Sequence, residues 1–264
     1  MVSGHPKLQR PHTVTFDCWS TLLYHPTSTQ AKADRARELA TLLGTDLEAT
    51  RIALRDAWHT HQLEWHRRRV FGAHDMVDFT LQALGQASSA QRVNEIVAAL
   101  EPSMLAVDVQ PVAGGREALT RLAEAGVRRA LICDTGFSSG RVVRRLLDRH
   151  GLLELLEVTI FSDEVGVPKP HPRAFAAALE GLGVERVGAV HVGDLKRSDI
   201  AGARAHGMAS VRLTAHHDDR GNGRGAGVID CRAAGCTPPC ARPEADAVAG
   251  SYPELLEILG IDPA

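Results

Sequence analysis

The sequence lacks an excess of charge of either sign, because 30 lysine and arginine residues stand against 32 aspartate and glutamate residues. Such a chain has no overall field to attract nucleic acid or an anionic membrane, so we expect a small solute as its partner. It also lacks any run approaching the roughly 18 apolar residues of a membrane helix, and its first residues lack the apolar stretch of a signal peptide. We therefore expect a cytoplasmic protein without nucleic-acid or membrane partners.

Cysteine is scarce as well, with five residues, an odd number that does not suit a framework of disulfides. Cys18 and Cys133 lie at the ends of apolar runs, and a chain of this length can fold on its hydrophobic core without cross-links. We therefore expect reduced thiols, which fits a cytoplasmic location.

The other three cysteines gather near the C-terminus. Cys231, Cys236 and Cys240 have the spacing C-x4-C-x3-C and follow His216 and His217. Three soft ligands and one histidine could form a closed structural zinc site. The usual C-x2-C pair is missing, so the sequence also allows a loop of free thiols.

What the chain does have is a repeated alternation of short apolar runs and amphipathic segments. Short apolar runs of this kind are typical of buried parallel strands. We expect strands at 14–16, 128–133, 158–162, 187–192 and 209–213. Helical patterns occupy 115–126, 139–151, 172–183 and 198–207. This alternation predicts an α/β fold with a doubly wound, mostly parallel, Rossmann-type sheet.

Residues 28–106 break this alternation, since they contain no convincing strand. Their helical stretches are 28–43, 47–69, 74–85 and 89–105. The sequence thus predicts an all-helical cap at 28–106, inserted into an α/β core made of 12–27 and 107–264. The cap would lie over the strand ends where ligands bind in such sheets. Residues 106–115, which contain proline and glycine, are the expected hinge.

Polar residues follow the expected strands at the points where these strands end. In an open parallel sheet, catalytic groups collect at the carboxyl ends of adjacent strands. The residues found there are Asp17, the turn with Cys133, Thr135 and Gly136, then Lys169, and finally Asp194 and Asp199.

These groups, in this order, resemble the haloacid-dehalogenase-like hydrolase superfamily, whose motifs are an aspartate nucleophile, a serine or threonine, a lysine and an acidic pair. The resemblance spans residues 13 to about 214 and returns near the C-terminus, and the helical insert looks like the family's cap placed after the first motif. Asp17, Asp194 and Asp199 offer the hard oxygen ligands that Mg²⁺ prefers. The resemblance adds the backbone carbonyl of Trp19 as a further ligand.

The residue types fit hydrolysis through a covalent intermediate. Asp17 can attack a phosphorus atom or an alkyl carbon and form an ester that water then breaks. Lys169 would balance the negative charge of Asp17 and of the transferred group. Thr135 or the amides around it would hold a phosphate oxygen, and Gly136 would let the backbone approach closely.

Two positions depart from the family pattern. Phosphatases of the superfamily usually carry a second aspartate two residues after the nucleophile, as general acid and base, and Trp19 stands there in this chain. The serine or threonine of the second motif would align with Cys133, if Asp134 stands for the commoner asparagine, and Thr135 then comes one residue late. The usual general acid is therefore missing, and the phosphate-binding hydroxyl is not fixed by the sequence.

We predict a Mg²⁺-dependent phosphatase that acts on a small phosphorylated metabolite through an aspartyl-phosphate. The substitution at Trp19 leaves three alternatives open, namely a 2-haloacid dehalogenase, a phosphonatase, and a catalytically silent metal- or ligand-binding protein. Asp194 and Asp199 favour the metal-dependent reaction over dehalogenation, and Lys32 is the only lysine of the cap that a phosphonatase could use for a Schiff base.

One expected helix of the cap carries an unusual aromatic set, Trp58, His59, His61, Trp65 and His66. Trp58, His61 and Trp65, at offsets of three and four, share one face of the helix. Core packing is the favoured interpretation of this face. The alternative is that the face closes over the substrate and that a histidine supplies the missing acid, because histidine titrates near neutral pH.

Overall fold

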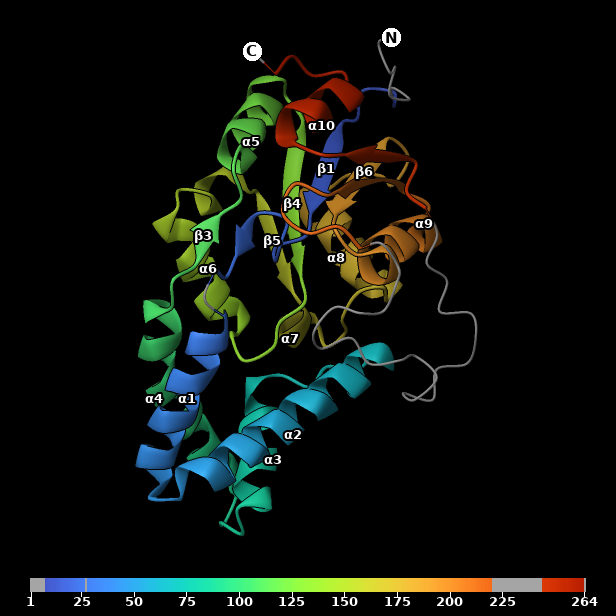
Figure 1. Ribbon diagram of the computed structural model, residues 1–264. Coiled ribbons are helices and arrows are strands. Elements are labelled where there is room, and N and C mark those ends of the chain that lie inside the picture. The colour runs from blue at the N-terminus through green and yellow to red at the C-terminus, as the bar shows by residue number, and fades with distance from the viewer. Residues whose placement is uncertain (1–7, 27, 220–243, 264) are drawn as a thin grey trace.

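The computed structural model describes residues 8–26, 28–219 and 244–263, which fold into a parallel sheet with helices on both faces and a separate group of helices at one end (Figure 1). The strands are β1 (Thr13–Phe16), β2 (Leu23–Tyr24), β3 (Gln110–Pro111), β4 (Arg128–Cys133), β5 (Val158–Phe161), β6 (Ala189–Gly193), β7 (Ala209–Leu213) and β8 (Ala247–Ala249). The helices are α1 (Ser28–Leu43), α2 (Leu47–His66), α3 (Ala73–Ala83), α4 (Ala90–Ala106), α5 (Gly115–Glu124), α6 (Gly140–Arg149), α7 (Ser162–Val165), α8 (Pro172–Leu182), α9 (Ala201–His206) and α10 (Tyr252–Ile258), with shorter turns at η1 (Leu153–Leu155) and η2 (Lys196–Ile200).

The main sheet has the strand order β5-β4-β1-β6-β7-β8, and each neighbouring pair is parallel. The expected doubly wound parallel sheet is thus confirmed. Strand β1 lies between β4 and β6, where Phe16 is opposite Leu131 on one side and Val192 on the other. The residue that follows β1 therefore lies at the centre of the carboxyl edge of the sheet.

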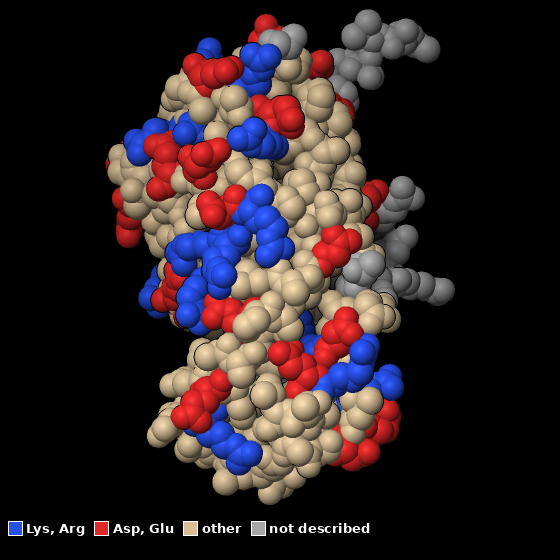
Figure 2. Space-filling model, turned by 90° about the vertical axis from the view of Figure 1, so that its left-hand side faces the viewer, with Lys and Arg blue, Asp and Glu red and all other residues tan. Residues whose placement is uncertain are grey.

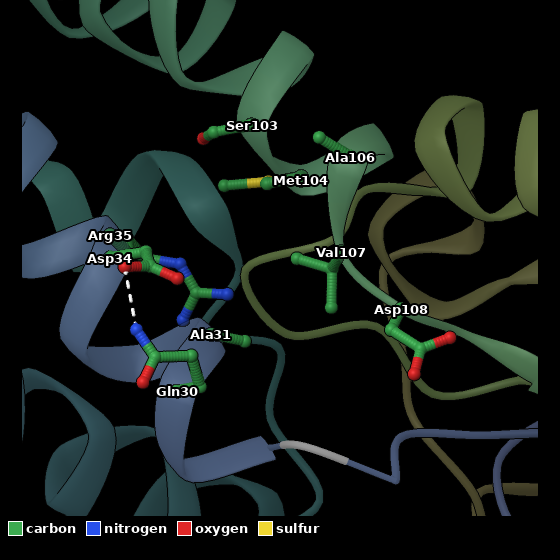
Figure 3. A pocket seen from close by; sticks show the side chains of 9 residues that line it. All are labelled: Gln30, Ala31, Asp34, Arg35, Ser103, Met104, Ala106, Val107 and Asp108. Carbon is green, nitrogen blue, oxygen red and sulfur yellow. Dashed lines mark hydrogen bonds between the residues drawn. The ribbon is translucent and has the colours of Figure 1, made fainter.

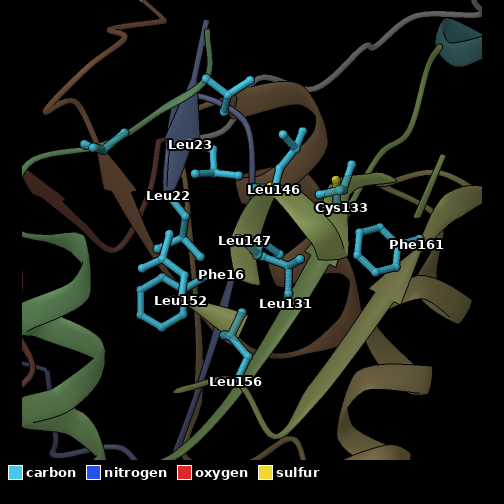
Figure 4. Packing of buried hydrophobic residues seen from close by; sticks show 14 of the residues in the cluster. Phe16, Leu22, Leu23, Leu131, Cys133, Leu146, Leu147, Leu152, Leu156 and Phe161 are labelled. Carbon is cyan, nitrogen blue, oxygen red and sulfur yellow. The ribbon is translucent and has the colours of Figure 1, made fainter. Parts of the chain in front are cut away.

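Helices cover both faces of this sheet because its strand residues are buried on both sides. On one face Phe16, Leu131 and Cys133 join a large apolar cluster with residues of α5, α6 and α10 (Figure 4). On the other face Ile132 packs in a smaller cluster around Phe175 of α8. Burial on both faces explains why the strands read as short, nearly continuous apolar runs.

The helical insert, residues 28–106, forms the four helices α1 to α4. Each of them packs on its neighbours, α1 on α2, α2 on α3, α3 on α4 and α4 on α1. Asp46 and Ser89 cap α2 and α4 by accepting a hydrogen bond from the amide three residues on. The insert lies at the end of the molecule opposite α5 and α10 (Figure 1). Its described residues form helices and no strand, as the sequence predicts.

Some elements differ from the sequence prediction. The helix expected at 198–207 is shorter, because it is preceded by the wider π-helical turn η2. The antiparallel pair of β2 and β3 was not predicted, since two residues in each strand are too few for a period to appear. The same applies to β8, which has three residues.

Within the described ranges, no helix combines the length and the apolar character needed to cross a membrane. On the face shown in Figure 2, basic side chains gather near the middle, with acidic side chains on several sides of them. Among the ion pairs, Arg141 of α6 pairs with Glu101, and Arg144 of the same helix pairs with Glu164. The mixture matches the formal net charge of −2.

Candidate active site

Asp17 follows β1 directly, and its backbone amide donates to the carbonyl of Val192 at 2.8 Å, which continues the pairing with β6. The side chain is buried, with Thr21 Oγ1 at 3.3 Å from Oδ2. The predicted nucleophile therefore has a fixed place at the centre of the carboxyl edge of the sheet. An acid buried in this way needs a partner.

Lys169 is that partner. Its ammonium contacts Asp17 Oδ1 and lies 2.8 Å from Asp199 Oδ1, and only 1% of the residue is exposed. Burial by itself lowers the pKa of a lysine, but the carboxylates of Asp17, Asp199 and Asp134 outweigh it and raise the pKa of Lys169 well above its usual value. The site therefore holds one permanent positive charge.

Three of the predicted residues form an acidic cluster. Oxygen atoms of Asp17, Asp194 and Asp199 all lie within 4.8 Å of one another, and all three residues are buried. Burial, together with repulsion from the other two acids, raises the pKa of Asp17 against the opposing effect of Lys169. Burial also raises the pKa of Asp194 to about 6. A cation between these oxygens would relieve both costs.

The unused oxygens of the cluster indicate which acids could bind a metal directly. Asp194 Oδ1 is buried without a hydrogen-bond partner in the described structure. Asp199, by contrast, is fully engaged, since Oδ1 contacts Lys169 and lies 3.4 Å from His191 Nε2, and Oδ2 accepts from the amide of Leu195. Although burial opposes it, the ammonium of Lys169 and the hydrogen bond from His191 lower the pKa of Asp199. The oxygen donors of Asp17, Asp194 and Asp199 fit Mg²⁺, and the unpartnered oxygen of Asp194 is the one left available to it.

Two residues of the second motif, Cys133 and Thr135, are engaged in contacts within the protein. Cys133 is buried, its Sγ lies 3.6 Å from the carbonyl oxygen of Asp134, and burial beside Cys18 raises the pKa of its thiol. Thr135 is also buried, with its hydroxyl 3.0 Å from that of Ser162 and its amide donating to the same oxygen. A substrate would have to compete with Ser162 for the Thr135 hydroxyl.

Gly136, the third residue predicted to bind substrate, faces the helical insert. A Cβ at this position would lie 3.3 Å from the Trp58 ring and 3.7 Å from the His61 ring. A side chain here would make the Trp58 ring shift by a few tenths of an ångström, so glycine favours the close approach of α2 to the turn after β4. The aromatic face of α2 thus contacts the core at this turn rather than packing only inside the insert.

His61 has a defined orientation at this contact. Its Nδ1 donates to the carbonyl of Phe71 at 2.7 Å, and its ring stacks on Trp58. A carbonyl accepts only, so Nδ1 carries a hydrogen and the lone pair of the neutral ring is on Nε2, on the side of Gly136. Burial lowers the pKa of His61. His59, on the same helix, is exposed.

Trp19, in place of the usual second aspartate, is half-buried and stacks on His25 with ring centroids 4.6 Å apart. Burial lowers the pKa of His25. The position two residues after Asp17 therefore carries an aromatic ring in place of a carboxyl group. Lys32, the lysine considered for a Schiff base, is exposed, and its Nζ lies 5.7 Å from the Trp58 ring centroid.

Asp134 is a site residue that the sequence did not single out. One carboxylate oxygen accepts from the backbone amide of Lys169 at 2.8 Å, and the other accepts from Trp65 Nε1 of α2 at 2.8 Å. The signal for it in the sequence is an acid in the turn after β4, where the family more often has asparagine.

The zinc prediction concerns three cysteines that lie outside the described residues. The two histidines before them are described. His217 Nδ1 lies 2.6 Å from Asp194 Oδ2, and the ring of His216 lies against Tyr24. The hydrogen bond that His217 donates to Asp194 raises the pKa of His217. His217 therefore lies at the acidic cluster.

A pocket of about 270 Å³ lies between α1, α4 and the expected hinge (Figure 3). Arg35 points into it, with its guanidinium 4.3 Å from the Phe137 ring centroid. Burial lowers the pKa of Arg35 to about 10. None of the predicted site residues lines this pocket, so it is distinct from the cluster around Asp17.

Comparisons with known proteins agree with this geometry. Residues 11–207 match the family model of the haloacid dehalogenase-like hydrolases. The chain is 40% identical over 93 residues to the pyrimidine 5'-nucleotidase YjjG of Escherichia coli, a match that covers 35% of this chain and 40% of the nucleotidase. It is 30% identical to haloacid dehalogenase-like hydrolase domain-containing protein 3 of Bos taurus, over 75% of this chain and 79% of that protein.

Among solved structures, the fold is similar to that of an HAD phosphatase from Thermococcus onnurineus. The TM-score is 0.64 and the identity 22%, and the alignment covers 96% of this chain and 99% of the other. The strand order, the sequence of motifs at the strand ends and the family match over most of the chain lead to one conclusion. The chain belongs to the haloacid dehalogenase-like hydrolase family.

Proposed function

We propose that this protein is a Mg²⁺-dependent phosphatase of a small phosphorylated metabolite, with Asp17 as the nucleophile. The main support is the buried cluster in which Asp17 meets Lys169 and the free oxygen of Asp194. Phosphate-ester hydrolysis is also the reaction named for the Escherichia coli nucleotidase, although this chain spans only 40% of its length.

The proposed reaction has two steps. Asp17 attacks the phosphorus atom, the bond from phosphorus to the leaving oxygen breaks, and an aspartyl-phosphate forms. Water then attacks the phosphorus, releases inorganic phosphate and restores Asp17. Lys169 stays charged throughout and offsets the negative charge of the transferred group. Mg²⁺, held by Asp17, Asp194 and the carbonyl of Trp19, would neutralise the repulsion between the carboxylate and the phosphate.

The substrate would lie between the sheet edge and the helical insert, which we assign as a cap over a core of residues 12–27 and 107–264. The contact of Trp58 and His61 with Gly136 supports this assignment, because Gly136 belongs to the turn beside Asp17. A cytoplasmic location fits the free thiols of Cys18 and Cys133.

The rival proposal is a catalytically silent protein that binds the metal and a ligand without turnover. Trp19 favours it, since this residue replaces the usual proton donor. The two proposals differ in one measurement, the steady release of product. A silent protein binds Mg²⁺ with a phosphate-mimicking fluoride complex but releases no inorganic phosphate from any ester.

The experiment is a panel of phosphorylated metabolites with Mg²⁺, with haloacids and phosphonates as controls. We expect phosphate release that stops in excess chelator. Asp194→Ala should abolish the release or raise the Mg²⁺ requirement at least about tenfold, because it removes a direct ligand. The control Asp56→Ala changes an exposed acid of α2 and should keep wild-type activity. Halide release that persists in excess chelator would contradict the proposal and favour a dehalogenase.

A further inference from the structure

Asp134 joins two parts of the molecule that are far apart in the sequence. It follows β4, and its carboxylate contacts Trp65 of α2 in the helical insert and the backbone of Lys169 after β5, each at 2.8 Å. Lys169 is the residue whose ammonium contacts Asp17. A single side chain thus lies between the insert and the catalytic pair.

The two partners of Asp134 are both donors. Trp65 offers its indole N–H and Lys169 its backbone N–H, and neither group can accept a hydrogen bond. An ionised carboxylate accepts both. An asparagine would accept one and turn its NH₂ group toward the other donor, so one of the two contacts would be lost. The geometry therefore requires aspartate at a position where the family more often has asparagine.

Trp65 is held by the core from a second side. The guanidinium of Arg197 lies 3.8 Å from the Trp65 ring centroid, a cation–π contact. Arg197 belongs to η2, the turn that also carries Asp199. The indole of one insert residue therefore contacts the loops after both β4 and β6.

The neighbouring residues of α2 favour the same docked position. Trp58 and His61 pack on Gly136, two residues beyond Asp134, so closely that a Cβ there would lie 3.3 Å from the Trp58 ring. The hydrogen bond from Trp65 to Asp134 is a polar contact of this interface, and it forms only when α2 lies on the turn after β4.

From these contacts we propose that Asp134 is a positioning residue that couples the docking of α2 on the core to the placement of Lys169. With α2 docked, Trp65 fixes one oxygen of Asp134, and the other oxygen holds the Lys169 backbone so that the ammonium reaches Asp17. When α2 moves away, Asp134 loses this anchor and Lys169 is held less firmly. The catalytic part of this inference rests on the proposed phosphatase function, whereas the structural coupling does not.

The test is a double-mutant cycle of Asp134→Asn, Trp65→Phe and the double variant, read first by hydrogen exchange of the Lys169 amide. Trp65→Phe keeps an aromatic ring for Arg197 and removes the indole N–H together with part of the ring system. We expect each single variant to speed exchange at this amide at least about threefold, and the double variant to exchange no faster than Asp134→Asn. Trp58→Phe, which shortens an indole that has no hydrogen bond to Asp134, should speed the exchange less than Trp65→Phe does.

The same variants are then compared in the phosphatase assay. We expect Asp134→Asn to lower kcat at least about tenfold with little change in KM, because Lys169 acts in the chemical step. Trp65→Phe should lower kcat less, and the double variant should not be slower than Asp134→Asn.

The proposal would be overturned if the two single changes in exchange rate or in kcat multiply in the double variant. It would also be overturned if the Lys169 amide exchanges at the wild-type rate in both single variants. If Asp134→Asn does not fold, Trp65→Phe alone decides, since its Lys169 amide must still exchange faster than that of Trp58→Phe. A wild-type protein without phosphatase activity would remove the proposed function but leave the exchange experiment valid.

Discussion

At the scale of single residues, the site is a balance of one ammonium against several buried carboxylates. Lys169 alone cannot neutralise Asp17, Asp194 and Asp199, which is why burial and mutual repulsion raise the pKa of two of these acids. A divalent cation at this cluster would offset the excess of negative charge. The free oxygen of Asp194 shows where such a cation would bind.

Trp19 leads to a prediction about leaving groups. Without a carboxyl group at this position, the leaving oxygen departs largely as an anion, so esters of acidic phenols should react at least about a hundredfold faster than alkyl phosphates. The measurement is kcat/KM over a series of esters of graded leaving-group pKa. A steep dependence is the expected result.

Two variants complete this experiment. Trp19→Asp supplies the acid and should accelerate alkyl esters selectively, whereas Trp19→Phe keeps an aromatic ring beside His25 and should leave them slow. Equal rates for alkyl and aryl esters in the wild type would mean that another group already donates the proton. The histidines of α2, His59, His61 and His66, would then each be replaced by glutamine and assayed against alkyl esters.

At the scale of elements, helix α2 determines what the sheet edge meets. Its spacing of three and four residues puts Trp58, His61 and Trp65 on one face, as the sequence predicts. The structure places this face against the turn after β4 and not only in the interior of the insert. The face is therefore packed against the core, and the alternative, in which a histidine of this face supplies the missing acid, stays a prediction.

His61 gives this helix a pH-dependent stability. Burial lowers its pKa in the folded protein below the ordinary value of 6.5, so the unfolded chain binds the proton first as the pH falls. The contribution of His61 to stability is therefore complete above pH 6.5 and is lost as the pH falls from there toward the folded pKa.

We predict that His61→Gln weakens the pH dependence of the free energy of unfolding below this value, by up to about 1.4 kcal/mol per pH unit. Denaturant unfolding at a series of pH values measures it. His59→Gln, at an exposed position of the same helix, should keep the wild-type slope. A His61→Gln slope identical to that of wild type would show that this ring does not titrate differently on folding.

The elements also show what could be predicted from the sequence. Long strands and helices have a period, so the parallel sheet and the helices of the insert were predicted within a few residues. Elements of two or three residues, such as β2 and β8, are too short to show a hydrophobic period. In the site, Asp17 and Lys169 were found because strand ends meet at one edge. The contact of Asp134 with Trp65 joins residues 69 positions apart, which no local pattern encodes.

At the scale of the whole molecule, strand order decides which residues can react together. Strand β1 lies between β4 and β6. Asp17 therefore meets Lys169, which follows β5, on the β4 side of β1, and Asp194, which follows β6, on the other side. The helical insert leaves the core after β2 and returns at β3, so the two short strands join both connections in one antiparallel pair. Motion of α2 would then act on the site through Asp134 rather than through the sheet.

The proposed phosphatase function depends most on the covalent role of Asp17, and trapping the aspartyl-phosphate tests that role directly. The protein is mixed with Mg²⁺ and a reactive aryl phosphate, quenched in acid within one turnover, digested and analysed by mass spectrometry. We predict one phosphoryl group on the peptide that contains Asp17, removed by hydroxylamine and absent from Asp17→Asn, a folded variant without turnover. Steady turnover with no phosphoryl group on this peptide, or turnover by Asp17→Asn at the wild-type rate, would contradict the account.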